Sequence, residues 1–351
     1  MNHQINRRIF SAVATGAILG LSKPVLAEST VNPTLDIHVH LFGVGDSGSD
    51  CHIADKVSQG FLFRHLKTML KLNDATNGTV DQQYEQTMVR QVVESELSMA
   101  AVLAQDAVYG ANGKIDLTAT SFYVPNDYLF EVVGRHPKQL IACPSINPNR
   151  ADVIDELERC HDRKARMLKI HPPTQNVDLL DPKHTKFFGR CRELDMTILV
   201  HTGHEHSAPI FSHELAAPRK LRAALDEGCR VVACHAGSGW FSDSPSYLGE
   251  FLQLLDRFTE LWGDTSVLGT AFRAQDFGRL LDSGKEVLDR LLHGSDFPFP
   301  ASPVVFADRI GQETALKTAG IQNLIQRDFA LKKHLGIGEA SALRSHRVVI
   351  A

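Results

Sequence analysis

The stretch LDIHVH (Leu35–His40) is a short apolar run that ends in two histidines at alternate positions. Three later runs end similarly: Thr197–His201 and Arg230–His235 end in histidine, and Leu291–Asp296 ends in aspartate. Short apolar runs of about 4 to 8 residues are typical of buried β-strands. In a parallel barrel the carboxyl ends of the strands meet at one mouth, where active sites are built. Five polar side chains are therefore predicted to converge there: His38, His40, His201, His235 and Asp296.

Short apolar runs alternate with longer amphipathic stretches along most of the chain, which predicts repeated βα units. The predicted strands are 35–40, 100–104, 140–146, 167–171, 197–201, 230–235, 266–270 and 291–296. The predicted helices between them are 127–135, 151–163, 184–194, 218–227, 245–261 and 272–282, and closing helices are predicted at 303–311 and 321–335. Eight strands favour a (β/α)8 TIM barrel with extra C-terminal helices. An open parallel sheet is the alternative, since no sequence rule distinguishes closure.

A single barrel domain is predicted over residues 28–351, with a long insertion after the first strand. Residues 41–99 exceed a usual βα loop and contain two helix-like runs, Ala54–Leu72 and Val80–Leu97. The insertion leaves from the end of the barrel that carries the site, which predicts a lid or a pocket wall.

The segment Met1–Ala27 is predicted to be a signal peptide, because a basic start precedes an apolar stretch and small residues. Within it, Asn6–Phe10 (NRRIF) resembles a bacterial twin-arginine signal. An ordinary secretory signal with two arginines is the alternative. Both predict an exported, periplasmic protein.

Composition excludes some classes of function. The chain has 37 Lys and Arg against 41 Asp and Glu, a net charge of -4, so it has no excess positive field for nucleic acid. The expected partner is a small-molecule substrate, no stable membrane span is expected in the mature chain, and a homo-oligomer stays open. The six cysteines include no CxxC pair, and Cys143 and Cys234 are predicted to be small buried hydrophobes.

Strand geometry explains the spacing of the metal-ligand candidates. Residues i and i+2 point to one face, so His38 and His40 are predicted to face inward together, with Asp36 below them. Imidazole and carboxylate on one site indicate a divalent metal, zinc first and manganese second. Lys169 and His171 share a face that is predicted to be the barrel interior, where an unpaired lysine is costly. Lys169 could anchor an anionic substrate or form a carbamate that bridges two ions. His171 could contact the ion or the substrate, or serve as a capping polar group.

The motifs LDIHVH, LKIHPP, ILVHTG, ACHAG and HGSDFP, in this order, resemble those of the amidohydrolase superfamily, in its amidohydrolase-related (amidohydrolase 2) branch. The resemblance spans residues 35 to 335, with Phe329 where the family commonly has Asn. It implies four metal ligands: His38, His40, His201 and Asp296. It makes Asp296 a proton acceptor as well. It makes His235 a catalytic group beside a single ion, or a ligand of a second ion.

The predicted function is a metal-dependent hydrolase whose metal-activated water attacks an amide, ester or lactone carbonyl of a small molecule. The alternative is a metal-dependent lyase, a non-oxidative decarboxylase or hydratase, acting on a small carboxylic acid. A third interpretation is a periplasmic metal-binding or solute-binding protein without catalysis. Trp240 and Arg273 follow predicted strands and are expected to contact substrate.

Overall fold

The computed structural model describes residues 33–72, 75–241 and 246–350. The predicted signal peptide lies outside the described residues, so export stays a prediction. Within those ranges, none of the helices has the length and apolar character needed to cross a membrane.

Eight parallel strands of the described chain form the barrel. They are β1 (Leu35–His40), β3 (Met99–Leu103), β5 (Leu140–Cys143), β6 (Met167–Ile170), β7 (Thr197–His201), β8 (Val231–Cys234), β9 (Leu261–Asp264) and β10 (Leu291–Leu292). Backbone hydrogen bonds arrange them as β1-β3-β5 and β6-β7-β8-β9-β10. A parallel bridge between Ser145 and Lys169 joins β5 to β6, and another between Val39 and Phe297 joins β1 to the segment after β10. The strands therefore close into a (β/α)8 TIM barrel, as predicted.

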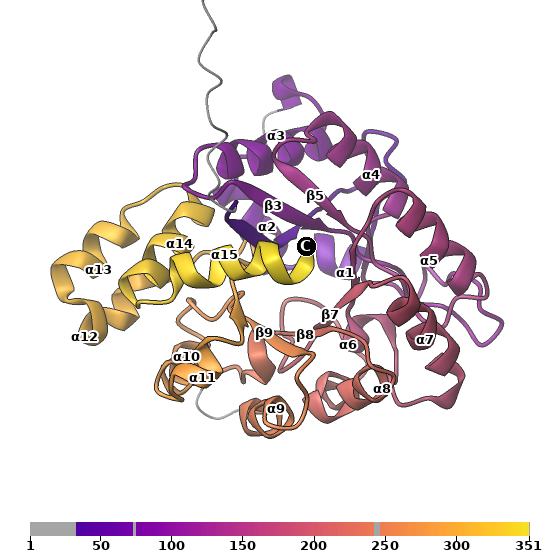
Figure 1. Cartoon of the computed structure of the whole chain (residues 1–351). Coiled ribbons are helices and arrows are strands. Elements are labelled where there is room, and N and C mark those ends of the chain that lie inside the picture. The colour runs from indigo at the N-terminus through magenta and orange to yellow at the C-terminus, as the bar shows by residue number, and fades with distance from the viewer. Residues whose placement is uncertain (1–32, 73–74, 242–245, 351) are drawn as a thin grey trace, which may run out of the picture. The chain divides into compact units, whose positions relative to one another are not determined.

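Helices surround this ring of strands (Figure 1). The α-helices are α1 (Asp55–Ser58), α2 (Phe61–Met69), α3 (Val80–Val93), α4 (Asn126–Arg135), α5 (Val153–Asp162), α6 (Pro172–Gln175), α7 (Thr185–Glu193), α8 (Arg222–Asp226), α9 (Leu248–Leu255), α10 (Ala274–Leu281), α11 (Lys285–Leu288), α12 (Ala307–Ile310), α13 (Gln312–Ala319), α14 (Leu324–His334) and α15 (Gly338–Val349). The 3-10 helices are η1 (Ala75–Asn77), η2 (Pro182–His184), η3 (His213–Ala216), η4 (Pro218–Leu221), η5 (His235–Gly237) and η6 (Pro303–Phe306). Helices α13 and α15 were not expected from the sequence.

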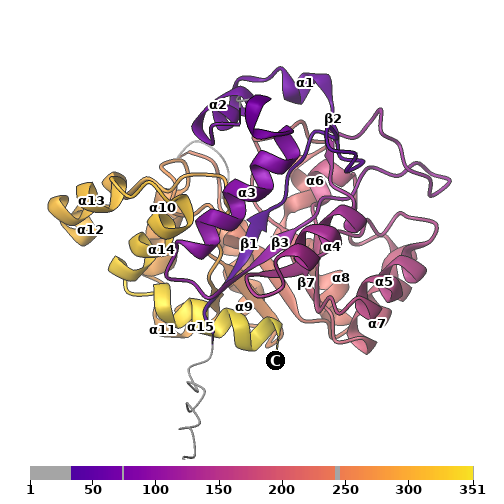
Figure 2. The same ribbon diagram turned by 90° about the horizontal axis from the view of Figure 1, so that it is seen from above.

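The barrel interior is apolar at one end and polar at the other. Leu35, Leu199 and Val232 belong to an interior cluster that Val349 of α15 also joins. All four side chains are buried, and burying one such aliphatic side chain stabilises the fold by about 1.5–3 kcal/mol. Figure 2 places α15 at one end of the strands and helices α1 and α2 of the insertion at the other. The C-terminal helix thus closes the end of the barrel opposite the metal-ligand candidates.

The register of β1 against β3 shifts between Asp36 and Val39, which corrects the prediction that Asp36 lies below the two histidines. Leu35 and Ile37 pack in the interior cluster, whereas Val39 packs in the outer core. A bulge in a strand reverses the alternation of its side chains. Two histidines therefore face the mouth of the barrel from a strand whose first half presents apolar residues to the interior.

The seventh strand is not where the sequence pattern placed it. Strand β9 is Leu261–Asp264, whereas 266–270 was predicted. Residues 266–270 form a turn, in which Val267 has a positive φ of 58° that no strand residue adopts. The helix before it also ends earlier than predicted, at Leu255. The run Leu261-Trp262 pairs with Val231 and Val232 of β8, so the register of the sheet selects it.

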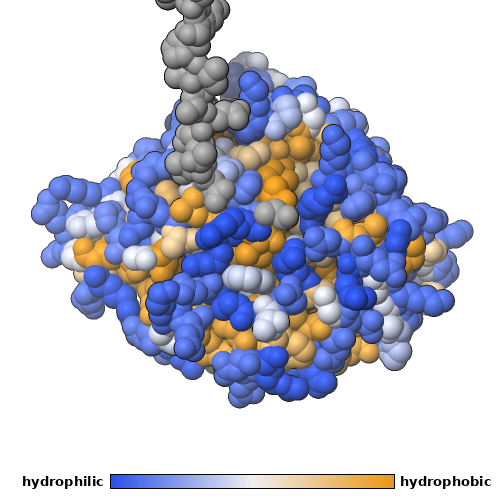
Figure 3. Space-filling model, viewed as in Figure 1, coloured by the Kyte–Doolittle hydropathy of each residue, from blue (hydrophilic) through white to orange (hydrophobic). Residues whose placement is uncertain are grey.

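The insertion after β1 contains α1, α2 and α3, where the sequence predicted two helix-like runs. It also contains β2 (His52–Ile53), which pairs antiparallel with β4 (Phe122–Tyr123) and ties the insertion to the segment after β3. Its role as a lid stays a prediction. The face shown in Figure 3 is largely hydrophilic, with apolar patches between the polar side chains.

Candidate metal centre

Strand β1 and the segment after β10 bring three ligand candidates into contact. His38 Nε2 lies 3.2 Å from Asp296 Oδ1, and His40 Nε2 lies 3.1 Å from the same oxygen. The backbone N–H of Asp296 donates to the His38 carbonyl, which fixes the aspartate beside the strand. Asp296 has a positive φ of 65°, a backbone conformation that side chains other than glycine rarely adopt and that clusters at functional sites.

Asp264 orients His38, and sequence reasoning missed it. Its Oδ2 lies 2.7 Å from His38 Nδ1, and its Oδ1 accepts the backbone N–H of His235 at 2.8 Å. Both Asp264 and His38 are fully buried. An ionised carboxylate only accepts, so His38 Nδ1 carries the hydrogen and Nε2 keeps a lone pair. The available signal was the acidic residue that ends the run Leu261-Trp262-Gly263-Asp264, at the same strand-end position that carries the other candidates.

A second chain of hydrogen bonds fixes the histidines of β7 and β8. His235 Nδ1 lies 3.1 Å from the Ser266 carbonyl oxygen, a pure acceptor, so Nδ1 carries the hydrogen. His235 Nε2 is then an acceptor for His201 Nδ1, 3.1 Å away. His201 Nε2 is left with a lone pair, and this buried atom makes no hydrogen bond to any described residue. An unsatisfied buried acceptor of this kind fits a metal ligand.

The lone-pair atoms around His38 also fit a cation. His38 Nε2 and Asp296 Oδ1 are both acceptors, yet they face each other across 3.2 Å. Acceptors at that separation repel unless a positive group lies beside them. Lys169 supplies one, since its Nζ lies 3.2 Å from His38 Nε2 and 3.2 Å from Cys234 Sγ. Lys169 is fully buried inside the barrel, as predicted, and forms no ion pair with a carboxylate in the described part of the chain.

His171 and His201 form a second group with Glu205. The two rings stack with centroids 4.0 Å apart, and Glu205 Oε2 lies 3.3 Å from His171 Nε2 and 3.8 Å from His201 Nε2. All three ligand atoms lie within 4.8 Å of one another. Burial acts to raise the pKa of Glu205, but His171 and the Ser207 hydroxyl lower it more, to about 2. Glu205 stands only four residues after His201, and this spacing was the signal for it.

Arg273 and Trp240 lie together at the mouth. The Arg273 guanidinium is buried and donates to the Ser238 carbonyl and hydroxyl and to the His204 carbonyl. Its carbon Cζ lies 5.8 Å from the centroid of the Trp240 ring. Arg273 thus braces the loops after β7 and β8, and its contact with substrate stays a prediction, as does that of Trp240.

The six cysteines are all buried and free, and Cys143 and Cys234 are fully buried, as predicted. Burial raises the pKa of the Cys143 thiol to about 12, so this thiol stays protonated near neutral pH. Cys143 is therefore not an activated nucleophile.

Burial keeps the imidazoles of His38 and His235 neutral. It lowers the pKa of His38 to about 4, with Lys169 adding to the effect, and it lowers the pKa of His235 to about 3. Burial acts to raise the pKa of Asp296, but His38, His40 and His235 lower it more, so it lies well below its usual range. At neutral pH His38 and His235 are therefore neutral and Asp296 is ionised, and neutral imidazole and ionised carboxylate are the protonation states that metal binding requires.

We expect the metal-free protein to lose stability when the pH falls from 7 to 5. His38 has its ordinary pKa of 6.5 in the unfolded chain and about 4 in the folded chain. Between these values the unfolded chain binds more protons, so the free energy of unfolding falls as the pH falls, by about 2 kcal/mol for this group. Urea denaturation with a chelator at both pH values measures the change. A His38→Asn variant should depend less on pH, and an equal dependence would contradict this origin.

The family model described as amidohydrolase matches residues 35–322. No curated protein matches the chain significantly. Among solved structures, an uncharacterized TIM-barrel protein from Bordetella bronchiseptica is similar with a TM-score of 0.58 and 13% identity, over 90% of this chain and 99% of that one.

Two further solved structures are similar at lower scores. A 5-carboxyvanillate decarboxylase from Sphingomonas paucimobilis has a TM-score of 0.48 and 11% identity, over 90% of this chain and 99% of its own. A 2,6-dihydroxybenzoate decarboxylase from Rhizobium has a TM-score of 0.44 and 14% identity, over 87% and 99%.

Proposed function

The chain belongs to the amidohydrolase family of metal-dependent enzymes, and from this premise we propose that it is a hydrolase of small molecules. The bond cleaved is an amide, ester or lactone. The observation that carries the proposal is the set of lone pairs described above. His38 Nε2 and His201 Nε2 are acceptors, because the Nδ1 atom of each ring is engaged in a hydrogen bond, and Asp296 is an ionised acceptor beside His38 and His40.

We assign four residues to hold the ion: His38, His40, His201 and Asp296. Three imidazoles and one carboxylate suit zinc, and manganese is the alternative. His201 Nδ1 donates its hydrogen to His235 Nε2, so the lone pair of His235 Nε2 is already engaged. This hydrogen bond favours one ion with His235 beside it. Two ions would require that hydrogen bond to break and Lys169 to be converted to a carbamate. When bound, such an ion lowers the pKa of water to about 7 and polarises a substrate carbonyl.

Asp296 and His235 supply the proton chemistry of the chain itself. Asp296 is ionised and lies at the mouth, so its carboxylate accepts a proton from the attacking water and returns it to the leaving group. His235 is neutral, and hydrogen bonds to Ser266 and His201 hold its ring beside the centre, so we assign it a role in positioning the water or the substrate. These roles divide the work between a base and a positioning imidazole.

The test is metal content together with turnover. We expect the metal-stripped full chain to take up one zinc or manganese ion more per chain than a His38→Ala/His40→Ala variant does, measured by elemental analysis, and to hydrolyse members of an ester, lactone and amide panel only after reconstitution. A His38→Ala/His40→Ala variant should lose both the ion and the activity. A reconstituted enzyme inert on the whole panel would contradict the hydrolase proposal.

One observation favours the second candidate, a lyase acting on a small carboxylic acid. Lys169 presents a buried amine next to His38 without a carboxylate partner in the described residues, so it could attract a substrate carboxylate. A carboxylic acid panel assayed for release of carbon dioxide, with the same reconstituted enzyme, separates the two. Turnover of acids and none of esters, lactones or amides would establish the lyase.

A further inference from the structure

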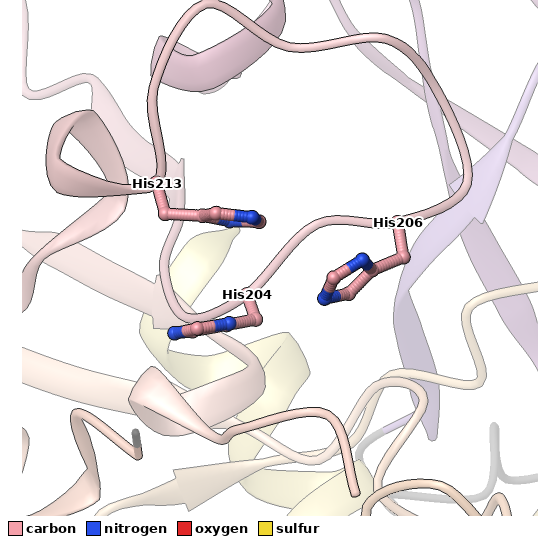
Figure 4. Close-up of side chains that lie close together, drawn as sticks. All are labelled: His204, His206 and His213. Carbon is pink, nitrogen blue, oxygen red and sulfur yellow. The ribbon is translucent and has the colours of Figure 1, made fainter. Parts of the chain in front are cut away.

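Three histidines gather on the segment after β7, outside the centre described above. Ligand nitrogens of His204, His206 and His213 lie within 4.8 Å of one another. In Figure 4 the His204 and His213 rings lie parallel while His206 reaches toward them from the side. The ring centroids are 4.5 Å apart for His204 and His213, 5.1 Å for His206 and His213, and 6.0 Å for His204 and His206. We call these three residues the rim triad.

The rim triad and the barrel centre are distinct because neighbouring side chains of one segment point in different directions. Glu205, between two triad members, points its carboxylate to His171 and His201. Its neighbours His204 and His206 turn instead toward His213, which begins η3. The same short segment thus presents one acid to the barrel centre and two imidazoles to a different point.

The backbone of the segment is held in place at several points. The N–H of His204 donates to the Ser238 carbonyl at 3.2 Å, and the His204 carbonyl accepts from the buried Arg273. On the far side, the N–H of Phe211 donates to the Pro173 carbonyl at 2.8 Å, just before the Ser212 side chain caps η3. The rim triad is therefore mounted on an anchored loop, which reduces the entropy lost when a ligand fixes it.

The state of His213 points to a ligand. Its Nδ1 is buried and makes no hydrogen bond to any residue that the structure describes. A buried ring nitrogen in this state is costly to leave without a partner. His206 is exposed, so an ion can enter from solvent, and the Trp240 ring lies 5.2 Å away.

We propose that His204, His206 and His213 bind a transition-metal ion of the zinc class at the rim of the barrel, separate from the ion of the barrel centre. Three imidazoles are a recurrent ligand set for zinc, with a fourth position left to water. Nitrogens about 2.0–2.1 Å from a tetrahedral ion lie roughly 3.4 Å apart. The ligand nitrogens of the rim triad lie within 4.8 Å of one another, so side-chain rotations that bring them closer by roughly 1.4 Å or less would close the site. The ion joins η3 to the segment that carries Glu205.

The experiment counts ions on a full chain without a histidine tag, since a tag would itself bind metal. The stripped protein is titrated with Zn²⁺ and, in parallel, with Co²⁺, whose absorption reports coordination by nitrogen. Three double variants are compared: His206→Ala/His213→Ala at the rim, His38→Ala/His40→Ala in the barrel, and His65→Ala/His334→Ala as a control. The control removes two exposed histidines that belong to neither site.

We expect the rim variant to bind one ion fewer per chain than the parent, and the control to bind as many as the parent. The barrel variant should keep the rim ion, so this site remains detectable even if the barrel binds no metal and the proposed function fails. Equal ion numbers and affinities in parent and rim variant would overturn the proposal. So would the loss of every ion in a folded barrel variant.

Circular dichroism checks folding of each variant. Should the rim double variant not fold, the single change His206→Gln at the exposed position replaces it, with a weaker Zn²⁺ affinity expected. Copper titrated into the barrel variant gives a second readout, because hyperfine splitting from several imidazole nitrogens is expected in its electron paramagnetic resonance spectrum. A spectrum without nitrogen splitting would also overturn the proposal.

Discussion

Replacing Asp296 with asparagine is expected to lower kcat/KM by about 10²- to 10⁴-fold, the usual contribution of a positioned acid–base group. The amide keeps the size and one oxygen of the carboxylate but cannot accept a proton. It also loses the charge that His38 and His40 stabilise in the folded protein. The measurement is kcat/KM on the best substrate of the panel, with metal content determined on the same samples.

The matched control is Asp308→Asn, an exposed aspartate in α12. It should retain the parent activity. If Asp296→Asn keeps its ion but loses turnover, Asp296 acts mainly as the proton acceptor. If it loses both, Asp296 is needed to bind the ion. Undiminished turnover would contradict both roles.

Replacing Asp264 is expected to have the second large effect, on metal affinity and on stability together. Asp264→Asn removes the charge that holds the hydrogen on His38 Nδ1, and loss of such a supporting carboxylate usually costs about 10–100-fold in metal affinity. Asp264→Ala removes the acceptor of the Ser266 hydroxyl and leaves three buried N–H donors without an acceptor: His38 Nδ1–H and the backbone N–H groups of His235 and Ser266. At about 1–3 kcal/mol for each, the free energy of unfolding should fall by at least about 3 kcal/mol.

Competition with a chelator measures the affinity, and urea denaturation measures the stability. Asp256→Ala, at an exposed position after α9, is the control for loss of a carboxylate in the same region. An Asp264→Asn variant with the affinity of the parent would show that the tautomer of His38 is set by something other than this contact.

Much of the fold and the centre could be predicted because strand ends are local features. The runs that end at His40 and His201 are strands with those bounds, and the run before Asp296 leads to the same mouth. Lys169 was predicted to face inward from the period of β6, and it does, fully buried. The alternation of side chains along a strand and the length of an apolar run are both visible in a single segment, without knowledge of the strand it pairs with.

The predictions that were wrong concern features that depend on the pairing of one strand with another. The pattern 266–270 is as apolar as Leu261–Asp264, and only pairing with β8 and β10 selects the latter. That one displacement hid Asp264, because the residue then counted as part of a loop. The shift in register between Asp36 and Val39 was equally invisible, since it is defined against β3.

The sequence by itself determined which side chains end the strands, and hence that imidazoles and a carboxylate meet at one mouth. Only the tertiary structure decided which nitrogen of each ring faces inward. That choice rests on Asp264 for His38 and on Ser266 for His235, residues far from them in the chain. The tertiary structure also brought His213 back to His204 and His206. The physical reason is that residue type and period are local, whereas tautomer, charge state and ligand grouping depend on contacts that only packing creates.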